Sequence, residues 1–290
     1  MKIMAVVNVA LEKSLMNMKS LLTRVFSALV ALGIFIILFQ FLGTNGFKII
    51  IVFGVLVGSF ELMKMLLKDS DSRSNKFAFY FLLVSIFSLC SLYPSFSALV
   101  FAFVSIVYLL FSILILHKFE SLEELHSFQS KSIMGFFYMG LLPSFIMQIL
   151  DLPHGMIWFL ALLGIVFAGD IGAYLVGMNF GKNKIMPLVS PKKTVEGSVG
   201  GVIFSIITAV VLSFYLEHIN PLALVLLAIP TSVVAQFGDF FESVIKRVAE
   251  VKDSGKIMPG HGGVLDRIDG VLFAAPVILF GALILERVSV

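Results

Sequence analysis

Residues 155–178 read GMIWFLALLGIVFAGDIGAYLVGM, an apolar run that contains one charged side chain, Asp170. A helix crosses the ~30 Å hydrocarbon core of a bilayer with about 20 apolar residues, so this run is long enough to span a membrane. Only helices and closed barrels can span lipid, and no segment of the chain shows the alternation of a barrel strand. The run therefore predicts a transmembrane helix.

The composition of the whole chain agrees with this prediction. Of 290 residues, 59% are hydrophobic and 13% are charged, with a mean hydropathy of +1.05. Soluble domains carry about 25% charged residues, so this chain has too little polar surface for a soluble globule. A soluble enzyme, a disordered chain and a disulfide scaffold are excluded, the last because Cys90 is the only cysteine. The net charge of +3 is too small to indicate a nucleic-acid partner.

The hydropathy pattern predicts an all-α, polytopic integral membrane protein with about nine transmembrane helices. We expect spans at 25–43, 49–67, 77–95, 98–116, 133–150, 155–178, 198–216, 222–246 and 268–285. The chain then divides into a cytoplasmic tail (1–24), an N-terminal membrane region (25–132) and a C-terminal catalytic membrane region (133–290). The last region contains two polar loops, at 179–197 and 247–267.

The distribution of positive charge predicts the orientation of the spans. In the nine-span arrangement all of the 21 Lys and Arg residues except Lys48 and Arg287 fall on one side. The positive-inside rule makes that side cytoplasmic. We therefore expect a cytoplasmic N-terminus, an external C-terminus, both polar loops in the cytoplasm, and location in the cell (inner) membrane.

Several carboxylates lie within or beside the predicted spans, where an ionisable group is costly and often functional. Asp170, Asp239, Asp266 and Asp269 should reach one level near the cytoplasmic boundary, because each lies close to that end of its helix. Oxygen ligands without His or Cys favour Mg²⁺ or a similar hard cation. The alternative is that each carboxylate pairs with a nearby Lys or Arg; for Glu61, with Lys64 three residues on, we favour that alternative.

The two polar loops carry side chains suited to phosphate groups. The first contains Ser190, Lys192, Lys193 and Thr194 immediately before a helix start, where anions bind readily. In the second, a stripe of Asp239, Ser243 and Lys246 at i, i+4 and i+7 leads into a loop. Candidate binding residues in and after this stripe are Ser243, Arg247, Lys252, Asp253, His261, Gly262, Gly263 and Arg267. A cation, several basic groups and helix N-termini together favour phosphoryl or nucleotidyl transfer at a membrane surface.

The second loop resembles the signature of the phosphatidate cytidylyltransferases (CDP-diacylglycerol synthases). The similar residues are Ser243-x-x-Lys246-Arg247, Lys252-Asp253 and Pro259-x-His261-Gly262-Gly263-x-x-Asp266-Arg267-x-Asp269. Asp170-x-x-Ala173-Tyr174, Ser190-Pro191-x-Lys193-Thr194-x-Glu196-Gly197 and Gln236-x-Gly238-Asp239 resemble the other blocks of the family. The resemblance covers roughly residues 165–270.

The resemblance implies that CTP and phosphatidate react to give CDP-diacylglycerol and pyrophosphate. It implies metal ligation by Asp239, Asp266 and Asp269, and phosphate binding by Lys193, Lys246 and Arg267. We expect the catalytic residues to be Asp239, Lys246, Asp266, Asp269 and Lys193, with Asp170 and the loop residues named above binding the nucleotide. Mg²⁺, a monovalent cation such as K⁺, membrane lipid and a homodimer are also implied.

Two other functions remain open on the sequence. A CTP-dependent kinase of polyprenol or another lipid would share the nucleotide and the membrane but would use a different acceptor. An ion-coupled transporter would also place carboxylates within spans, although such sites usually lie near the midplane between inverted repeats. The Asp-Gly at 269–270 lacks the pattern of a CDP-alcohol phosphotransferase, because Val-Leu-Phe-Ala-Ala follows it.

Overall fold

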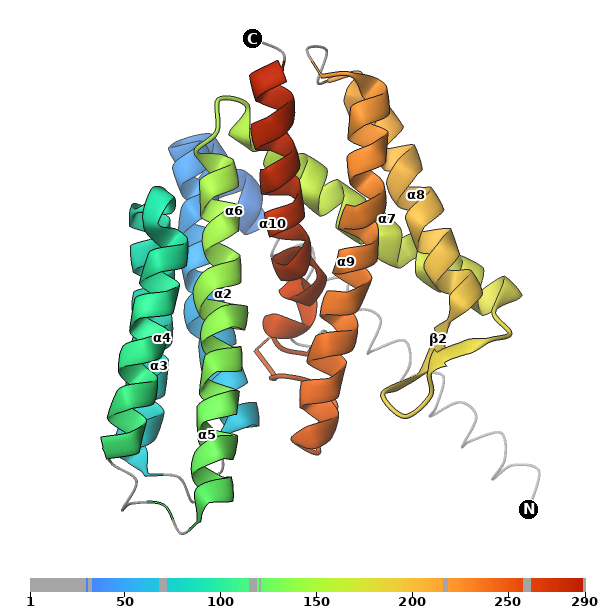
Figure 1. Cartoon of the computed structure of the whole chain (residues 1–290). Coiled ribbons are helices and arrows are strands. Elements are labelled where there is room, and N and C mark those ends of the chain that lie inside the picture. The colour runs from blue at the N-terminus through green and yellow to red at the C-terminus, as the bar shows by residue number, and fades with distance from the viewer. Residues whose placement is uncertain are drawn as a thin grey trace, which may run out of the picture.

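The protein is a bundle of long apolar helices, shown in a computed structural model (Figure 1). The structure describes residues 30, 33–67, 72–114, 119, 121–215, 219–257 and 262–288. Within these residues, eight helices are long and apolar enough to cross a membrane, and a shorter apolar helix covers Gly33–Leu42. The prediction of an all-α polytopic membrane protein is confirmed. Of the first expected span, 25–43, the structure describes residues 30 and 33–43, which contain the helix Gly33–Leu42.

The helices follow one another along the chain, and the two longest connections are 181–194, between α7 and α8, and 249–264, between α9 and α10. Their bounds are α2 (Thr44–Leu66), α3 (Arg73–Leu92), α4 (Ser97–Leu114), α5 (Leu122–Gly135), α6 (Leu142–Leu150), α7 (Gly155–Phe180), α8 (Val195–Ser213), α9 (Pro221–Val248) and α10 (Leu265–Val288). In Figure 1, α2 to α6 lie on one side of α10 and α8 and α9 lie on the other, while α7 passes behind α10 from the first side to the second. Helix α10 contacts α2, α6, α7 and α9, so it joins the two groups of helices.

Helices α7 and α8 approach each other closely because glycine lines their contact. A Cβ atom at Gly172 would lie 2.6 Å from the Cβ atom of Phe204. At Gly200 it would lie 2.5 Å from the Cβ atom of Val176. Small residues permit such close packing between helices in membranes, where lipid offers no hydrophobic drive for association. The packing fixes the end of α7 and the start of α8 relative to each other.

The predicted span at 133–150 is part of a longer helical segment. Helix α5 continues through a π-helical stretch, Phe136–Leu141, into α6, and the whole segment runs from Leu122 to Leu150. Pro143 has no N–H and its ring would clash with the carbonyl one turn earlier, and a π-bulge is a common way to relieve such a conflict. The expected region boundary at 132/133 falls inside this segment.

Three of the predicted external segments meet at one end of the bundle. Lys48 forms an ion pair with Asp151, which joins the start of α2 to the turn between α6 and α7. Near the end of α10, Glu286 accepts a hydrogen bond from Trp158 Nε1 at 2.7 Å, and its Oε1 lies 3.3 Å from His154 Nδ1. The loops between α7 and α8 and between α9 and α10 lie toward the opposite end of these helices (Figure 1).

A small β-hairpin was not expected from the sequence. Strands β1 (Lys184–Met186) and β2 (Ser190–Thr194) pair antiparallel within the loop between α7 and α8. Each strand is too short to show an alternating pattern, and neither has a buried face that would impose one. Strand β2 leads directly into α8, so the hairpin presents its lysines beside a helix N-terminus.

Candidate active site

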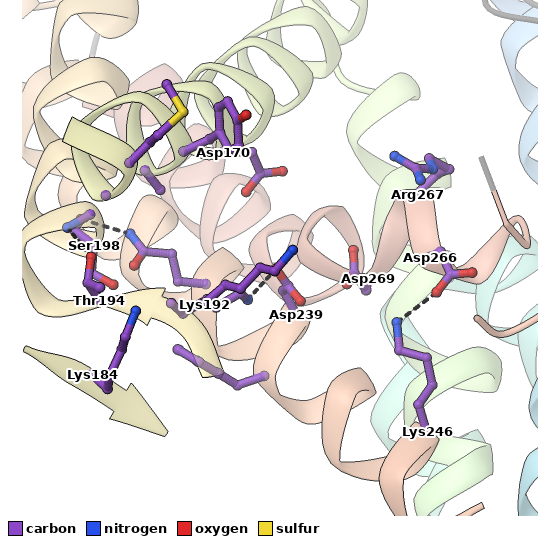
Figure 2. A pocket seen from close by; sticks show the side chains of 18 of the residues that line it. Asp170, Lys184, Lys192, Thr194, Ser198, Asp239, Lys246, Asp266, Arg267 and Asp269 are labelled. Carbon is purple, nitrogen blue, oxygen red and sulfur yellow. Dashed lines mark hydrogen bonds and ion pairs between the residues drawn. The ribbon is translucent and has the colours of Figure 1, made fainter. Parts of the chain in front are cut away.

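A cavity of about 750 Å³ opens at the loop ends of α7, α8, α9 and α10 (Figure 2). Its wall combines charged side chains of both signs. The acidic residues are Asp170, Asp239, Asp253, Asp266 and Asp269, and the basic residues are Lys184, Lys192, Lys193, Lys246 and Arg267. Such a mixture suits a ligand that brings phosphate groups together with a cation.

Three of the carboxylates come to this cavity from three different helices. Asp170 lies on α7, Asp239 on α9 and Asp269 on α10, and Figure 2 shows them around one space. The predicted convergence of these helices near one level is therefore confirmed. The oxygen of Asp269 accepts a hydrogen bond from the amide of Gly270 at 2.8 Å.

The hairpin supplies the basic wall opposite these carboxylates. Lys193 forms an ion pair with Asp239, and its ammonium group lies 4.3 Å from the centre of the Phe240 ring. The next residue, Thr194, caps α8 by accepting a hydrogen bond from the amide of Gly197 at 3.2 Å. This cap ends the strand and begins the helix at a fixed residue, which holds Lys193 over the cavity.

Lys246 is held by two carboxylates at the other side of the cavity. It donates to Asp266 Oδ1 at 2.7 Å and also pairs with Glu242, whose side chain is fully buried. Sequence reasoning missed Glu242, although its i, i+4 spacing to Lys246 is a visible signal for an ion pair on a helix. Glu242 and Asp266 together fix the ammonium group at the cavity wall.

Asp266 organises the loop that precedes α10 as well as holding Lys246. Its Oδ2 accepts hydrogen bonds from the amides of Ser254 at 2.9 Å and Gly263 at 2.8 Å. Gly262 has a φ of +84°, a conformation that L side chains rarely adopt, and a Cβ atom there would lie 2.6 Å from Asp266 Oδ2. Glycine at this position allows the loop backbone to wrap around the carboxylate.

Other predicted site residues lie away from the cavity or outside the described chain. Six predicted site residues are described by the structure but do not line the cavity: Ser190, Ser243, Arg247, Lys252, Gly262 and Gly263. Arg247 instead donates to the carbonyls of Val189 at 3.2 Å and Val251 at 3.3 Å, which ties the hairpin to the end of α9. Ser243 donates to Asp239 Oδ1 at 3.4 Å. His261 lies outside the described residues.

Lys184 lines the cavity without having been predicted to do so. It stands in β1 and reaches the cavity because the hairpin places it opposite Thr194 in the strand pairing. Ser198, in the first turn of α8, accepts a hydrogen bond through its carbonyl from Gln236 Nε2 at 3.2 Å. Both positions depend on the hairpin and on the contact between α8 and α9, which sequence spacing does not reveal.

The carboxylates suit a metal that takes part of its coordination from the substrate. Among the residues that the structure describes, no group of three or more His, Cys, Asp or Glu side chains converges on a common point. Mg²⁺ usually binds to one or two carboxylates plus substrate phosphates and water. Asp239 and Asp269 fit that pattern. Both oxygens of Asp239 already have a partner, Ser243 and Lys193, but this side chain is 35% exposed and Lys193 is free to turn to a substrate phosphate. Asp266 is 9% exposed, and its two oxygens are held by Lys246 and by the loop before α10. The metal assignments of all three aspartates stay predictions.

The sequence matches the profile of the cytidylyltransferase family over residues 22–284. The chain belongs to the cytidylyltransferase family. A phosphatidate cytidylyltransferase of Staphylococcus saprophyticus is 32% identical over 259 residues, which cover 89% of this chain and 88% of the relative. The family membership predicted from the signature residues is therefore confirmed, and the family match extends well beyond them.

Other relatives align over a shorter stretch at higher identity. The phosphatidate cytidylyltransferase of Bacillus subtilis is 39% identical over 145 residues, which are 49% of this chain and 54% of the relative. The enzyme of Staphylococcus haemolyticus is 45% identical over 115 residues, which are 39% of this chain and 44% of the relative. In these two alignments the chain spans about half the length of the relatives that it matches.

Proposed function

We propose that this chain is a nucleotidyltransferase that transfers CMP from CTP to phosphatidate, giving CDP-diacylglycerol and pyrophosphate. The observation that carries this proposal is that one cavity gathers most of the charged residues of the signature from α7, the hairpin, α9 and the segment that leads into α10. Family membership and the similarity to phosphatidate cytidylyltransferases support the choice of CTP and phosphatidate.

The reaction needs no nucleophile from the protein. A phosphate oxygen of phosphatidate, already ionised, attacks the α-phosphorus of CTP, and the bond between that phosphorus and the oxygen bridging to the β-phosphorus breaks. Pyrophosphate leaves with that electron pair. The attacking and leaving groups are both anionic, and two unit charges 4 Å apart repel by ~4 kcal/mol at an effective dielectric of about 20. Lys193, Lys246 and Arg267 are the groups that we expect to offset this repulsion.

We propose Asp239 and Asp269 as the principal ligands of Mg²⁺, which would neutralise phosphate charge when bound. Asp266 would become a ligand only by giving up its ion pair with Lys246. A monovalent cation such as K⁺, a homodimer and a cavity that faces the cytoplasm of the cell membrane complete the proposal. The concentration of basic residues on the loop side supports this orientation.

The proposal is tested with purified protein in detergent, phosphatidate, Mg²⁺ and CTP labelled at the α-phosphate. The expected result is magnesium-dependent transfer of label to the organic phase with equal release of pyrophosphate. The Asp239→Asn variant, purified and assayed in parallel, is the matched control and should transfer no label.

Other outcomes would identify a different function. Release of CDP instead of pyrophosphate would show a lipid kinase and overturn the proposed transfer. No turnover of CTP with any lipid phosphate or lipid alcohol would overturn the enzyme assignment and favour the ion-coupled transporter.

A further inference from the structure

Glu61 is a buried carboxylate on α2 that has no role in the reaction proposed above. It lies on α2, in the N-terminal membrane region and far in sequence from the residues that carry the family signature. Its side chain is buried, with an exposed fraction of 3%, and most of the other residues of α2 are apolar. A carboxylate in such a place is costly unless it is hydrogen-bonded, so its partners indicate why it is there.

The partners of Glu61 all belong to the loop before α10 and to the start of that helix. Oε1 accepts from the amide of Val264 at 3.2 Å, and Oε2 accepts from the amide of Leu265 at 3.0 Å. Leu265 is the first residue of α10, so Glu61 satisfies N–H groups that the helix itself leaves unpaired. The ion pair of Glu61 with Lys64 that their spacing suggested is not present, although the structure describes both residues. Lys64 instead lies over the Phe60 ring, with its ammonium group 4.3 Å from the ring centre.

Ser254 connects Glu61 to the cavity. Its hydroxyl lies 3.2 Å from Glu61 Oε2 and 3.0 Å from Asp266 Oδ2, and its amide also donates to Asp266. Asp266 in turn accepts from Lys246 at 2.7 Å. A continuous series of polar contacts therefore runs from α2 to a lysine of the cavity wall.

Close packing fixes the loop backbone against the Glu61 carboxylate. A Cβ atom at Gly263 would lie 2.6 Å from both oxygens of Glu61, and one at Gly255 would clash with the same carboxylate. One turn earlier on α2, a Cβ atom at Gly58 would lie 2.8 Å from the Cε of Met139. The loop has little freedom to move relative to α2 while these contacts are made.

We infer that Glu61 is a positioning residue for the proposed reaction. It holds residues 253–257 and 262–267 so that Asp253, Asp266 and Arg267 lie at the cavity wall. The N-terminal membrane region thereby sets the geometry of a site whose charged groups all belong to the C-terminal region. This inference rests on the proposed function, because it assigns a catalytic consequence to the placement of that segment.

The Glu61→Gln variant tests the inference with little change in shape. Glutamine keeps one acceptor oxygen and replaces the other with an NH₂ group, which cannot accept from the amides of Val264 or Leu265. Ser254→Ala is a milder second variant that removes only the bridging hydroxyl. Lys64→Gln, three residues away on the same helix, is the matched control and should behave as the wild type.

We expect kcat of monodisperse Glu61→Gln protein to fall about 10- to 100-fold, because small displacements of positioned groups reduce turnover by such factors. Ser254→Ala should lower kcat less, and the double variant should lose less than the product of the single effects, because both act through one set of contacts. Amide hydrogen exchange should accelerate in residues 254–257 and 262–266 and stay unchanged in α8.

The outcomes separate a positioning role from a general effect on folding. Wild-type kcat in Glu61→Gln would overturn the inference, and so would faster exchange throughout the chain. Loss of kcat in Lys64→Gln would likewise overturn it. A wild-type chain that turns over no CTP would overturn the proposed function and the catalytic consequence with it, whereas the exchange data would still report whether Glu61 holds the loop.

Discussion

Replacing each of two cavity lysines by methionine should change the stability of the fold by very different amounts. Lys246 is 12% exposed, and its partners Glu242 and Asp266 are 0% and 9% exposed. Removing this cation leaves two buried carboxylates without a counter-charge, and breaking a buried pair costs about 3–5 kcal/mol. Lys193 and Asp239 are 29% and 35% exposed, and the loss of such a solvent-screened pair costs about 0–1 kcal/mol.

Thermal unfolding of the two variants in one detergent measures this difference. With about 2–4 °C per kcal/mol, Lys246→Met should lower Tm by roughly 6–20 °C, and Lys193→Met by no more than ~4 °C. Both variants should lose turnover, because both lysines line the cavity. Equal losses of Tm would refute the argument from burial, and a Lys193→Met protein with wild-type turnover would refute the assignment of Lys193 to the reaction.

Three further predictions address the metal, the helix cap and the loop. Chelation of divalent cations should stop turnover and added Mg²⁺ should restore it, while Asp239→Asn should stay inactive at every Mg²⁺ concentration; turnover without divalent cation would contradict the metal assignment. Thr194→Val removes the cap of α8 and should lower the free energy of unfolding by about 1 kcal/mol. A lower Tm and faster hydrogen exchange at the Gly197 amide would measure this loss, and unchanged exchange there would show that the cap is dispensable. Gly262→Ala should lower both Tm and kcat. An alanine there would have a left-handed backbone conformation, which costs about 1–2 kcal/mol, and its Cβ atom would clash with Asp266. A fully active variant would show that the loop tolerates another shape.

The fold was largely predictable because lipid restricts a spanning chain to very few structures. Apolar runs such as 155–178 and 222–246 correspond to α7 and α9 with shifts of only a few residues at their ends. The segment Leu122–Leu150 was harder, since its first half is polar enough to resemble a loop. The hairpin could not be predicted, because its strands are short and exposed and depend on contacts with α8 and α9.

The candidate site was predictable where its residues carry charge in an apolar setting. Asp170, Asp239 and Asp269 stand out in the sequence because each is an acidic residue close to the end of a span. The role of Glu61 was not predictable, since its partners are backbone amides near residue 264 and spacing along the chain favoured Lys64 instead. Arg247 shows the reverse case, in which a residue of the signature contacts backbone carbonyls outside the cavity.

The ion pairs of the cavity act as built-in counter-ions that a substrate must replace. In the proposed reaction, a triphosphate that binds Lys193 takes the place of Asp239, whose carboxylate then has an unbalanced charge in the cavity that also contains Asp269. That charge favours a divalent cation, so nucleotide binding should increase the affinity for metal. Because coupling between two ligands is reciprocal, metal should increase the affinity for nucleotide by the same factor. The resting protein would thus discriminate against either ligand alone and accept the two as a pair.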